Sequence, residues 1–264
     1  MNKIIIGQYY PVDSFIHRLD ARVKLLGTIM YITFLLFANN FLGYIISGTI
    51  LGILITISKV PPRLMIRGLR MILFILIFAA AINIFLTQGE TVLFQFLFIR
   101  ISLQGVLMAV QMTARLILLI VGSSILTLTT SPIELTDGIE SLLTPLKKIK
   151  VPAHDIAMMM TIALRFIPTL ADEMDKIIKA QKARGADFDT GGLIKRAKSL
   201  LPILIPLFVS AFKRADDLAT AMEARCYRGD INRTKMKETK MNLWDFLALS
   251  FMLLFGIVII LTRS

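Results

Sequence analysis

Long apolar runs alternate with short polar connections through the first half of this chain and return at its C-terminal end. Five runs come close to the ~20 residues that cross a bilayer. They are residues 25–40, 41–58, 71–87, 103–130 and 243–262. The pattern therefore predicts about five transmembrane helices. A sixth run, Val92–Ile99, is too short to cross and is interpreted as a hairpin or re-entrant piece at one membrane face.

Between the fourth and fifth runs, residues 131–240 predict three helices. The first starts at Ser131-Pro132, a capping residue followed by proline at the first helical position, and runs to about residue 143. The second extends over 153–184, and Gly185 ends it. The third covers about 193–228 after Gly191-Gly192, and Gly229 ends it. A glycine just past a helix readily takes the left-handed conformation that closes the last turn.

Each of the two long helices is apolar in its first half and charged in its second. Ala157–Leu170 contains Arg165 as its only charge, and Leu200–Phe212 contains none. Both stretches are too short to span a bilayer. We expect the apolar halves to lie along the inner membrane face and to pack on each other or on another membrane subunit. A cover over this protein's own bundle is the alternative.

A similar pattern occurs twice in this segment. Ala171-Asp172-Glu173-Met174 is followed after nine residues by Arg184-Gly185, and Ala215-Asp216-Asp217-Leu218 after nine residues by Arg228-Gly229. Arginine at a helix C-terminus opposes the negative end of the helix dipole, and that alone explains many such endings. Its planar fork also binds carboxylates and carbonyls across protein interfaces. Two matched cationic ends therefore predict docking onto two similar partners.

Composition and charge fix the class and the orientation. The chain of 264 residues is 56% hydrophobic with a mean hydropathy of +0.72, which indicates an integral membrane protein. Its net charge is +12, and residues 131–240 carry 19 Lys/Arg against 14 Asp/Glu. The positive-inside rule places the N-terminus and residues 131–240 in the cytoplasm, and five spans leave the C-terminus outside. The excess charge favours anionic lipid as a partner rather than nucleic acid.

Catalytic and metal-binding patterns are not found in the sequence. It has no Gly-Lys dipeptide for a phosphate loop and no His-Glu-x-x-His, and His17 and His154 are isolated. The single Cys226 excludes an internal disulfide. We therefore predict no enzyme, no cofactor and no metal site. Arg115 falls inside the fourth predicted span, where we expect a structural partner such as a backbone carbonyl or Gln111, with a substrate path as the alternative.

Several motifs together resemble one family, the transmembrane T component (EcfT, CbiQ-like) of energy-coupling-factor importers for vitamins and metals. The resemblance covers nearly the whole chain. The matching segments are Leu126-Thr127-Leu128-Thr129-Thr130-Ser131-Pro132 with Leu135, Pro152, Ala163-Leu164-Arg165-Phe166-Ile167-Pro168, Lys179-Ala180-Gln181-Lys182-Ala183-Arg184-Gly185, and Ala221-Met222-Glu223-Ala224-Arg225.

The resemblance implies an all-α integral membrane protein: a membrane bundle over 1–130, coupling helices over 131–240, two of them long and crossed, and a last transmembrane helix over 241–264. It implies a scaffold that couples two ABC-type ATPases to a separate S component, which binds the vitamin. An Ala-Arg-Gly signature at each long helix would dock on one ATPase. Here the signatures are Ala183-Arg184-Gly185 and Ala224-Arg225-Cys226, with Cys226 in place of glycine.

Two alternatives stay open at this point. The spacing of the repeat favours Arg228, next to Gly229, over Arg225 as the second docking arginine, whereas the motif match favours Arg225. A permease with its own solute pathway and attached ATPases is the alternative function. The expected S-component contacts lie in the apolar halves of the long helices, at Met158, Met159, Leu204 and Phe208.

Overall fold

The computed structural model describes residues 9–87, 91–96, 99–149, 152–186, 188, 192–229 and 241–262. Gly191, residues 230–240 and both chain ends therefore lie outside the described residues. The chain divides into two compact units. One, the bundle unit, comprises residues 7–138 and 239–264. The other, the long-helix unit, comprises residues 1–6 and 139–238.

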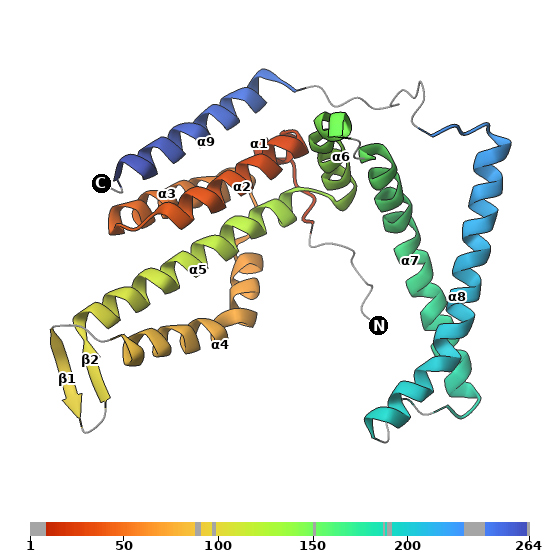
Figure 1. The fold of residues 1–264 in the computed structure, drawn as a ribbon, viewed down its shortest axis with the longest axis horizontal. Helices are drawn as coiled ribbons and strands as arrows, with labels where there is room; N and C mark the ends of the chain where they lie inside the picture. Colours follow the sequence, from red (N-terminus) through yellow and green to blue (C-terminus); the bar gives the residue numbers. More distant parts are fainter. Residues whose placement is uncertain are drawn as a thin grey trace. The chain divides into compact units, whose positions relative to one another are not determined.

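Helices and one small sheet build the bundle unit (Figure 1). Its elements in chain order are α1 (Phe15–Arg18), α2 (Ala21–Phe37), α3 (Phe41–Ser58), α4 (Pro62–Leu86), β1 (Val92–Phe96), β2 (Ile99–Ser102), α5 (Leu103–Thr129), the start of α6 (Pro132–Leu143) and α9 (Leu243–Thr262). The unit boundary falls inside α6. The start of α6 is fixed by a reciprocal cap, since Ser131 Oγ accepts from the Glu134 amide at 3.3 Å and Glu134 Oε2 from the Ser131 amide at 3.2 Å.

Three helices of the described chain are long and apolar enough to cross a membrane, namely α3, α5 and α9. The helix α4 adds a fourth span if its two straight pieces count as one, because Pro62–Arg70 and Ile72–Leu86 meet at 59°. The 17 residues of α2 are fewer than the ~20 that a straight span requires. The predicted class, a helical membrane protein, therefore agrees with the structure, whereas the count of five spans stays a prediction.

The short run after α4 forms a hairpin, as predicted. β1 and β2 pair antiparallel, with Val92 opposite Ser102 and Phe96 opposite Ile99, and the register shifts between Val92 and Phe94. Eight residues cannot cross a bilayer as a helix, but two paired strands satisfy most of each other's backbone groups. Apart from this hairpin, the regular structure of the described residues is helical.

Aromatic and small residues pack the centre of the bundle unit. Tyr31 of α2 stacks on Phe255 of α9 with ring centroids 5.8 Å apart. The Tyr31 ring also lies against Gly122 of α5, where an added Cβ would come within 2.5 Å of a ring carbon. The glycine therefore allows α5 and α2 to approach closely, as small residues do between membrane helices.

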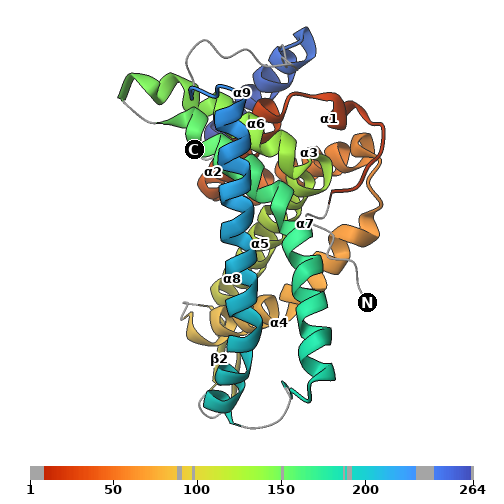
Figure 2. The same ribbon diagram turned by 90° about the vertical axis from the view of Figure 1, so that its right-hand side faces the viewer.

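The long-helix unit contains the end of α6, a 3-10 turn over Thr144–Ile149, α7 (Ala153–Ala183) and α8 (Leu193–Ala224). The predicted bounds of the first two helices of the segment are confirmed. α7 and α8 lie side by side and run in opposite directions (Figure 2). Pairs along their length show this direction, since Tyr227 donates to Met158 Sδ at 2.9 Å and Arg214 Nη2 to Glu173 Oε2 at 2.9 Å.

Candidate functional site

The C-terminal end of α7 is closed by a left-handed residue. The helix ends at Ala183, Arg184 is its C-cap residue, and Gly185 has φ +86°. The Gly185 amide donates to the carbonyl of Lys182 at 3.0 Å, and the Ala186 amide donates to that of Gln181 at 3.0 Å. This pair of bonds is the Schellman motif, which satisfies carbonyls that the end of a helix leaves without partners.

The C-terminal end of α8 has the same construction without a glycine. The helix ends at Ala224, Arg225 is its C-cap residue, and Cys226 takes the left-handed conformation at φ +55°. The Cys226 amide donates to the carbonyl of Glu223 at 2.8 Å, and the Tyr227 amide donates to that of Met222 at 3.0 Å. Arg225 therefore occupies the position in α8 that Arg184 occupies in α7.

The prediction that the third helix reaches about residue 228 and ends at Gly229 is wrong. Gly229 does have positive φ, at +72°, but it lies after the helix in a separate turn. The amides of Cys226 and Tyr227 already close the last turn of the helix, so the helix needs no later glycine to end it. The nine-residue repeat consequently does not align the two helix ends, whereas the motif match does.

Both helix ends present their side chains to solvent. Ala183, Arg184, Gly185, Ala224, Arg225 and Cys226 are all exposed, as is Arg228, while Gly229 is half-buried. Within the described part of the chain, no hydrogen bond or ion pair holds the guanidinium of Arg184 or Arg225. Each end therefore offers a charged fork with five N–H donors, flanked by small residues that permit close approach.

The antiparallel packing sets these two ends far apart. Because α7 and α8 run in opposite directions, Arg184 and Arg225 lie at opposite ends of the pair (Figure 2). α7 has 31 residues, which at the helical rise correspond to a length of about 46 Å. The two cationic ends are thus separated by a distance on the order of a helix length and are suited to contact two different bodies.

A polar contact ties the two helices together between their ends. Arg214 of α8 forms an ion pair with Glu173 of α7 at 2.9 Å. A hydrogen bond from Ser210, followed in weight by the hydrogen bond and charge of Arg214, lowers the pKa of the Glu173 carboxyl from its ordinary value. The carboxylate is therefore ionised at neutral pH and forms a charged contact between α7 and α8.

The antiparallel direction also changes how the apolar halves pack. Ile162 and Phe166, in the apolar half of α7, line a groove with Leu218 and Met222, from the charged half of α8. The expectation that the two apolar halves pack on each other is therefore wrong. In an antiparallel pair, each apolar half lies beside the charged half of the other helix. The other predicted packing, on another membrane subunit, stays a prediction.

The apolar half of α8 is left uncovered by α7. Its exposed large side chains recur at helical spacing; they are Leu200, Leu201, Leu204, Ile205, Phe208, Val209 and Phe212. This set is called the α8 apolar face below. Of the four predicted S-component contacts, Leu204 and Phe208 belong to it, Met159 is exposed on α7, and Met158 is half-buried and accepts from Tyr227. The periodicity of the run would have indicated its other members.

In the bundle unit, Arg115 of α5 forms hydrogen bonds with the end of α2 and with α3. Its Nη2 donates to the carbonyl oxygen of Ala38 at 2.8 Å and to the hydroxyl of Tyr44 at 2.7 Å. Ala38 is the C-cap residue of α2, so the cation stands at the negative end of that helix. The predicted backbone-carbonyl partner of Arg115 is confirmed.

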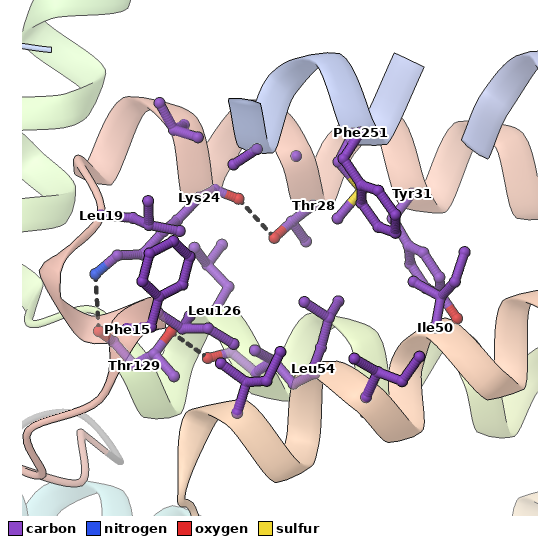
Figure 3. Close-up of a pocket in the computed structure, with 18 of the residues that line it drawn as sticks. Phe15, Leu19, Lys24, Thr28, Tyr31, Ile50, Leu54, Leu126, Thr129 and Phe251 are labelled. Carbon is purple, nitrogen blue, oxygen red and sulfur yellow. Dashed lines mark hydrogen bonds between the residues drawn. The ribbon is translucent and has the colours of Figure 1, made fainter. Parts of the chain in front are cut away.

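Lys24 is a buried cation that the sequence analysis did not single out. It is 8% exposed, and its Nζ donates to the carbonyls of His17 and Thr129, each at 3.0 Å. It lies at one end of an apolar cavity of about 400 Å³ between α2, α3, α5 and α9 (Figure 3). Since both acceptors belong to the last turns of helices, Lys24 joins α1, α2 and α5. Its place directly before an apolar run was the signal in the sequence.

Comparison with known proteins identifies the family of this chain. The family described as the cobalt transport protein CbiQ matches residues 13–236. The energy-coupling factor transporter transmembrane protein EcfT of Clostridium kluyveri is 55% identical over 261 residues, covering 98% of this chain and 97% of the relative. That of Ruminiclostridium cellulolyticum is 52% identical over 258 residues, covering 98% and 96%. That of Streptococcus equi subsp. equi is 44% identical over 264 residues, covering 100% and 98%.

The resemblance inferred from the motifs is therefore confirmed. The family match begins before α1 and ends beyond α8, so it includes Arg115, Lys24 and both long helices, while α9 lies beyond it. The chain belongs to the cobalt transport (CbiQ) family, in which its similar relatives are the EcfT transmembrane components of energy-coupling factor transporters.

Proposed function

We propose that this chain is the coupling subunit of an energy-coupling factor importer, which transmits ATP-driven motion of two ABC-type ATPases to an S component that binds a vitamin. The observation that carries the proposal is the pair of matching caps at opposite ends of α7 and α8. Each presents one exposed arginine, Arg184 or Arg225, on a closed helix end. In this proposal the chain itself has no catalytic residue, no metal and no cofactor.

The two caps suit two similar partners. A Schellman turn fixes the direction in which the helix stops, so the C-cap arginine leaves both helices with the same local geometry. Ala183 and Ala224 precede the arginines and leave room for a groove wall. Docking would pair each guanidinium with carboxylates or carbonyls of one ATPase. Arg228 and Gly229 follow the second cap and would lie at the margin of that contact.

The α8 apolar face is the second half of the proposal. Seven large exposed hydrophobic side chains on one helix exceed what a solvated helix normally shows and indicate a protein or membrane contact. We assign this face to the S component. Met158 and Met159 lie near the other end of the antiparallel pair and would make a separate contact with it. Leu204 and Phe208 would be central to the contact because they lie in the middle of the exposed run.

Transmission then follows from helix stiffness. ATP binding closes the two ATPases on each other, and helix ends held by separate ATPases must follow that motion. The Glu173–Arg214 pair and the groove around Phe166 hold α7 and α8 together at mid-length. Motion at the ends would reach the α8 apolar face through these contacts, and tilting of the S component would release its vitamin. This is a contiguous physical link between sites, as a coupling mechanism requires.

Topology completes the proposal. We place the chain in the cell membrane, with the N-terminus and residues 131–240 in the cytoplasm and the C-terminus outside, on the basis of the charge distribution. The domain division is a bundle over 1–130, coupling helices over 131–240 and a last span over 241–264. Five membrane helices would include α2 and α4 besides α3, α5 and α9.

Substitution of the two C-cap arginines tests the proposal. Arg184→Ala, Arg225→Ala and the double variant are co-purified with the two ATPases from membranes. Loss of an arginine anchor at an interface costs about 2 kcal/mol or more, roughly 30-fold in affinity. We expect each single variant to weaken association and the double variant to abolish vitamin uptake in proteoliposomes.

Arg228→Ala is the matched control, because it removes the same charge three residues beyond the second cap. It should retain most of the association, and all variants should elute as monodisperse protein. Normal uptake by the double variant, or a larger loss from Arg228→Ala than from Arg225→Ala, would contradict the docking assignment. For the alternative permease, the purified chain alone would bind the vitamin. We expect no such binding, because few polar side chains line the cavity among α2, α3, α5 and α9.

A further inference from the structure

The first part of α4 and the turn before it carry a cluster of cations that the proposed coupling function does not use. Lys59, Arg63, Arg67 and Arg70 fall within twelve residues that contain no acid. The next sixteen residues, 71–86, carry no charge at all. Charge therefore stops where the apolar part of α4 starts. A helix that changes character so abruptly is expected to cross from a polar layer into a hydrocarbon layer at that residue.

The three arginines of this helix share one face, which is called the arginine face below. At about 100° per residue, Arg63, Arg67 and Arg70 fall within about 60° of one another on the helix. All three are exposed. Met65 lies opposite them, is 4% exposed and belongs to the core of the bundle unit. The burial of Met65 therefore turns the arginine face away from the protein.

A bend separates the arginine face from the rest of α4. Pro62–Arg70 and Ile72–Leu86 meet at 59° (Figure 1). Beyond the bend, large apolar side chains are exposed, among them Phe74 at 77% and Ile77 at 61%. Such a surface is compatible with lipid and not with water. If the second piece enters the hydrocarbon layer, a bend of this size carries the first piece toward the membrane plane, at the depth of the headgroups.

In the part of the chain that the structure describes, the arginine face has no counter-charge bound to it. Among the described residues, Lys59, Arg63, Arg67 and Arg70 form no hydrogen bond or ion pair with a side chain. Guanidinium groups bind phosphate through two parallel hydrogen bonds, and clusters of Lys/Arg beside a membrane helix attract anionic lipid. We propose that the arginine face, with Lys59, binds the phosphate headgroups of anionic phospholipids.

Charge and position together select this occupant. An acidic protein surface would meet the charge, but the exposed apolar side chains that begin at Leu73, three residues after Arg70, place the face at a bilayer surface. A lipid matches both the positive charge and the adjacent apolar surface, with its phosphate on the arginines and its acyl chains along Leu73 and Phe74. The site is independent of the docking ends of α7 and α8, so its test does not depend on the proposed coupling role.

Lipid retention by the purified full-length chain tests the proposal. The chain is exposed in detergent to phosphatidylglycerol or to phosphatidylcholine, and bound lipids are counted by native mass spectrometry. Each Lys/Arg near an anionic surface contributes a factor of about five in affinity. We expect Arg63→Gln to lower phosphatidylglycerol affinity about 5-fold and R63Q/R67Q/R70Q roughly 100-fold. Phosphatidylcholine retention should not change, and the preference should weaken as salt is raised.

Two variants separate charge from structure. R63K/R67K/R70K keeps the charge and should keep most of the preference. K176Q/K179Q/K213Q removes the same charge from exposed lysines of α7 and α8 and should leave the preference intact. Equal phosphatidylglycerol retention by R63Q/R67Q/R70Q and the wild type would overturn the proposal, as would an equal loss in the lysine control. Displacement of the lipid by millimolar inorganic phosphate, or loss of ATPase association without loss of lipid, would also overturn it. If the triple variant fails to fold, the single variant Arg63→Gln gives the same decision.

Discussion

Cys226 provides a direct test of how α8 ends. It takes the left-handed conformation at φ +55°, which costs an ordinary L-residue about 1–2 kcal/mol. Cys226→Gly would remove that cost, while the more flexible unfolded backbone offsets it by about 0.5–1 kcal/mol. The net gain for the helix end is about 0.5–1 kcal/mol, or a factor of about two to five in local opening.

Hydrogen exchange measures this local opening. The reporters are the amides of Cys226 and Tyr227, which close the Schellman motif on Glu223 and Met222. In Cys226→Gly both amides should exchange about two to five times more slowly than in the wild type. In Cys226→Val they should exchange faster, because a β-branched side chain is strained further at positive φ.

The matched position in α7 supplies the control. Gly185 has φ +86° and no atom within 4 Å of an added Cβ, so Gly185→Ala introduces backbone strain without a clash. It should loosen the end of α7 by about 1 kcal/mol and leave the end of α8 unchanged. The reasoning fails if Cys226→Gly leaves exchange at both amides unaltered, or if Gly229→Ala slows or speeds it more than Cys226→Gly does.

Three further predictions concern packing and pH. Arg115→Met should lower the free energy of unfolding by about 1–3 kcal/mol, because its hydrogen bonds to the α2 C-cap carbonyl and to the Tyr44 hydroxyl are lost within the bilayer. Arg115→Lys should lose less. Equal stability of Arg115→Met and the wild type would contradict this. Gly122→Ala should destabilise the bundle unit by about 1–3 kcal/mol, because the added methyl group meets the Tyr31 ring. Gly52→Ala, which has open space around it, should not. Thermal unfolding in detergent measures both. The pKa of Glu173 is lowered, so its contribution to the α7–α8 contact is present above the ordinary carboxyl pKa and is lost as pH falls through the lowered value. Acid should therefore loosen the contact between α7 and α8, which faster hydrogen exchange of the α8 amides would report. Glu173→Gln should remove that pH dependence.

The relation between sequence and fold is closest where a signal is local. Apolar runs of membrane length predicted α3, α5 and α9, and Ser131 with Pro132 predicted the start of α6. Gly185 gave the end of α7 because glycine alone takes positive φ without cost. At the end of α8 the same rule failed. The local hydrogen bonds of the last turn place Cys226 in the left-handed region, and Gly229 three residues later was a false signal.

The candidate docking site was partly predictable for the same reason. The motif match identified Arg184 and Arg225, and the structure shows that both are C-cap residues. Their location at opposite ends of a pair was not predictable, because the direction of α8 against α7 depends on contacts such as Glu173–Arg214 across many residues. The same direction uncovers the α8 apolar face.

By itself, the sequence determined that this is a helical membrane protein with a charged segment and two arginine-capped helices, because hydropathy and capping act within a few residues. Only the tertiary structure decided which partners Arg115 and Lys24 have. Arg115 reaches the C-cap carbonyl of α2, and Lys24 reaches the last turns of α1 and α5. These bonds join residues from 7 to 105 positions apart, and such pairs are set by how helices pack rather than by the order of residues along any one of them.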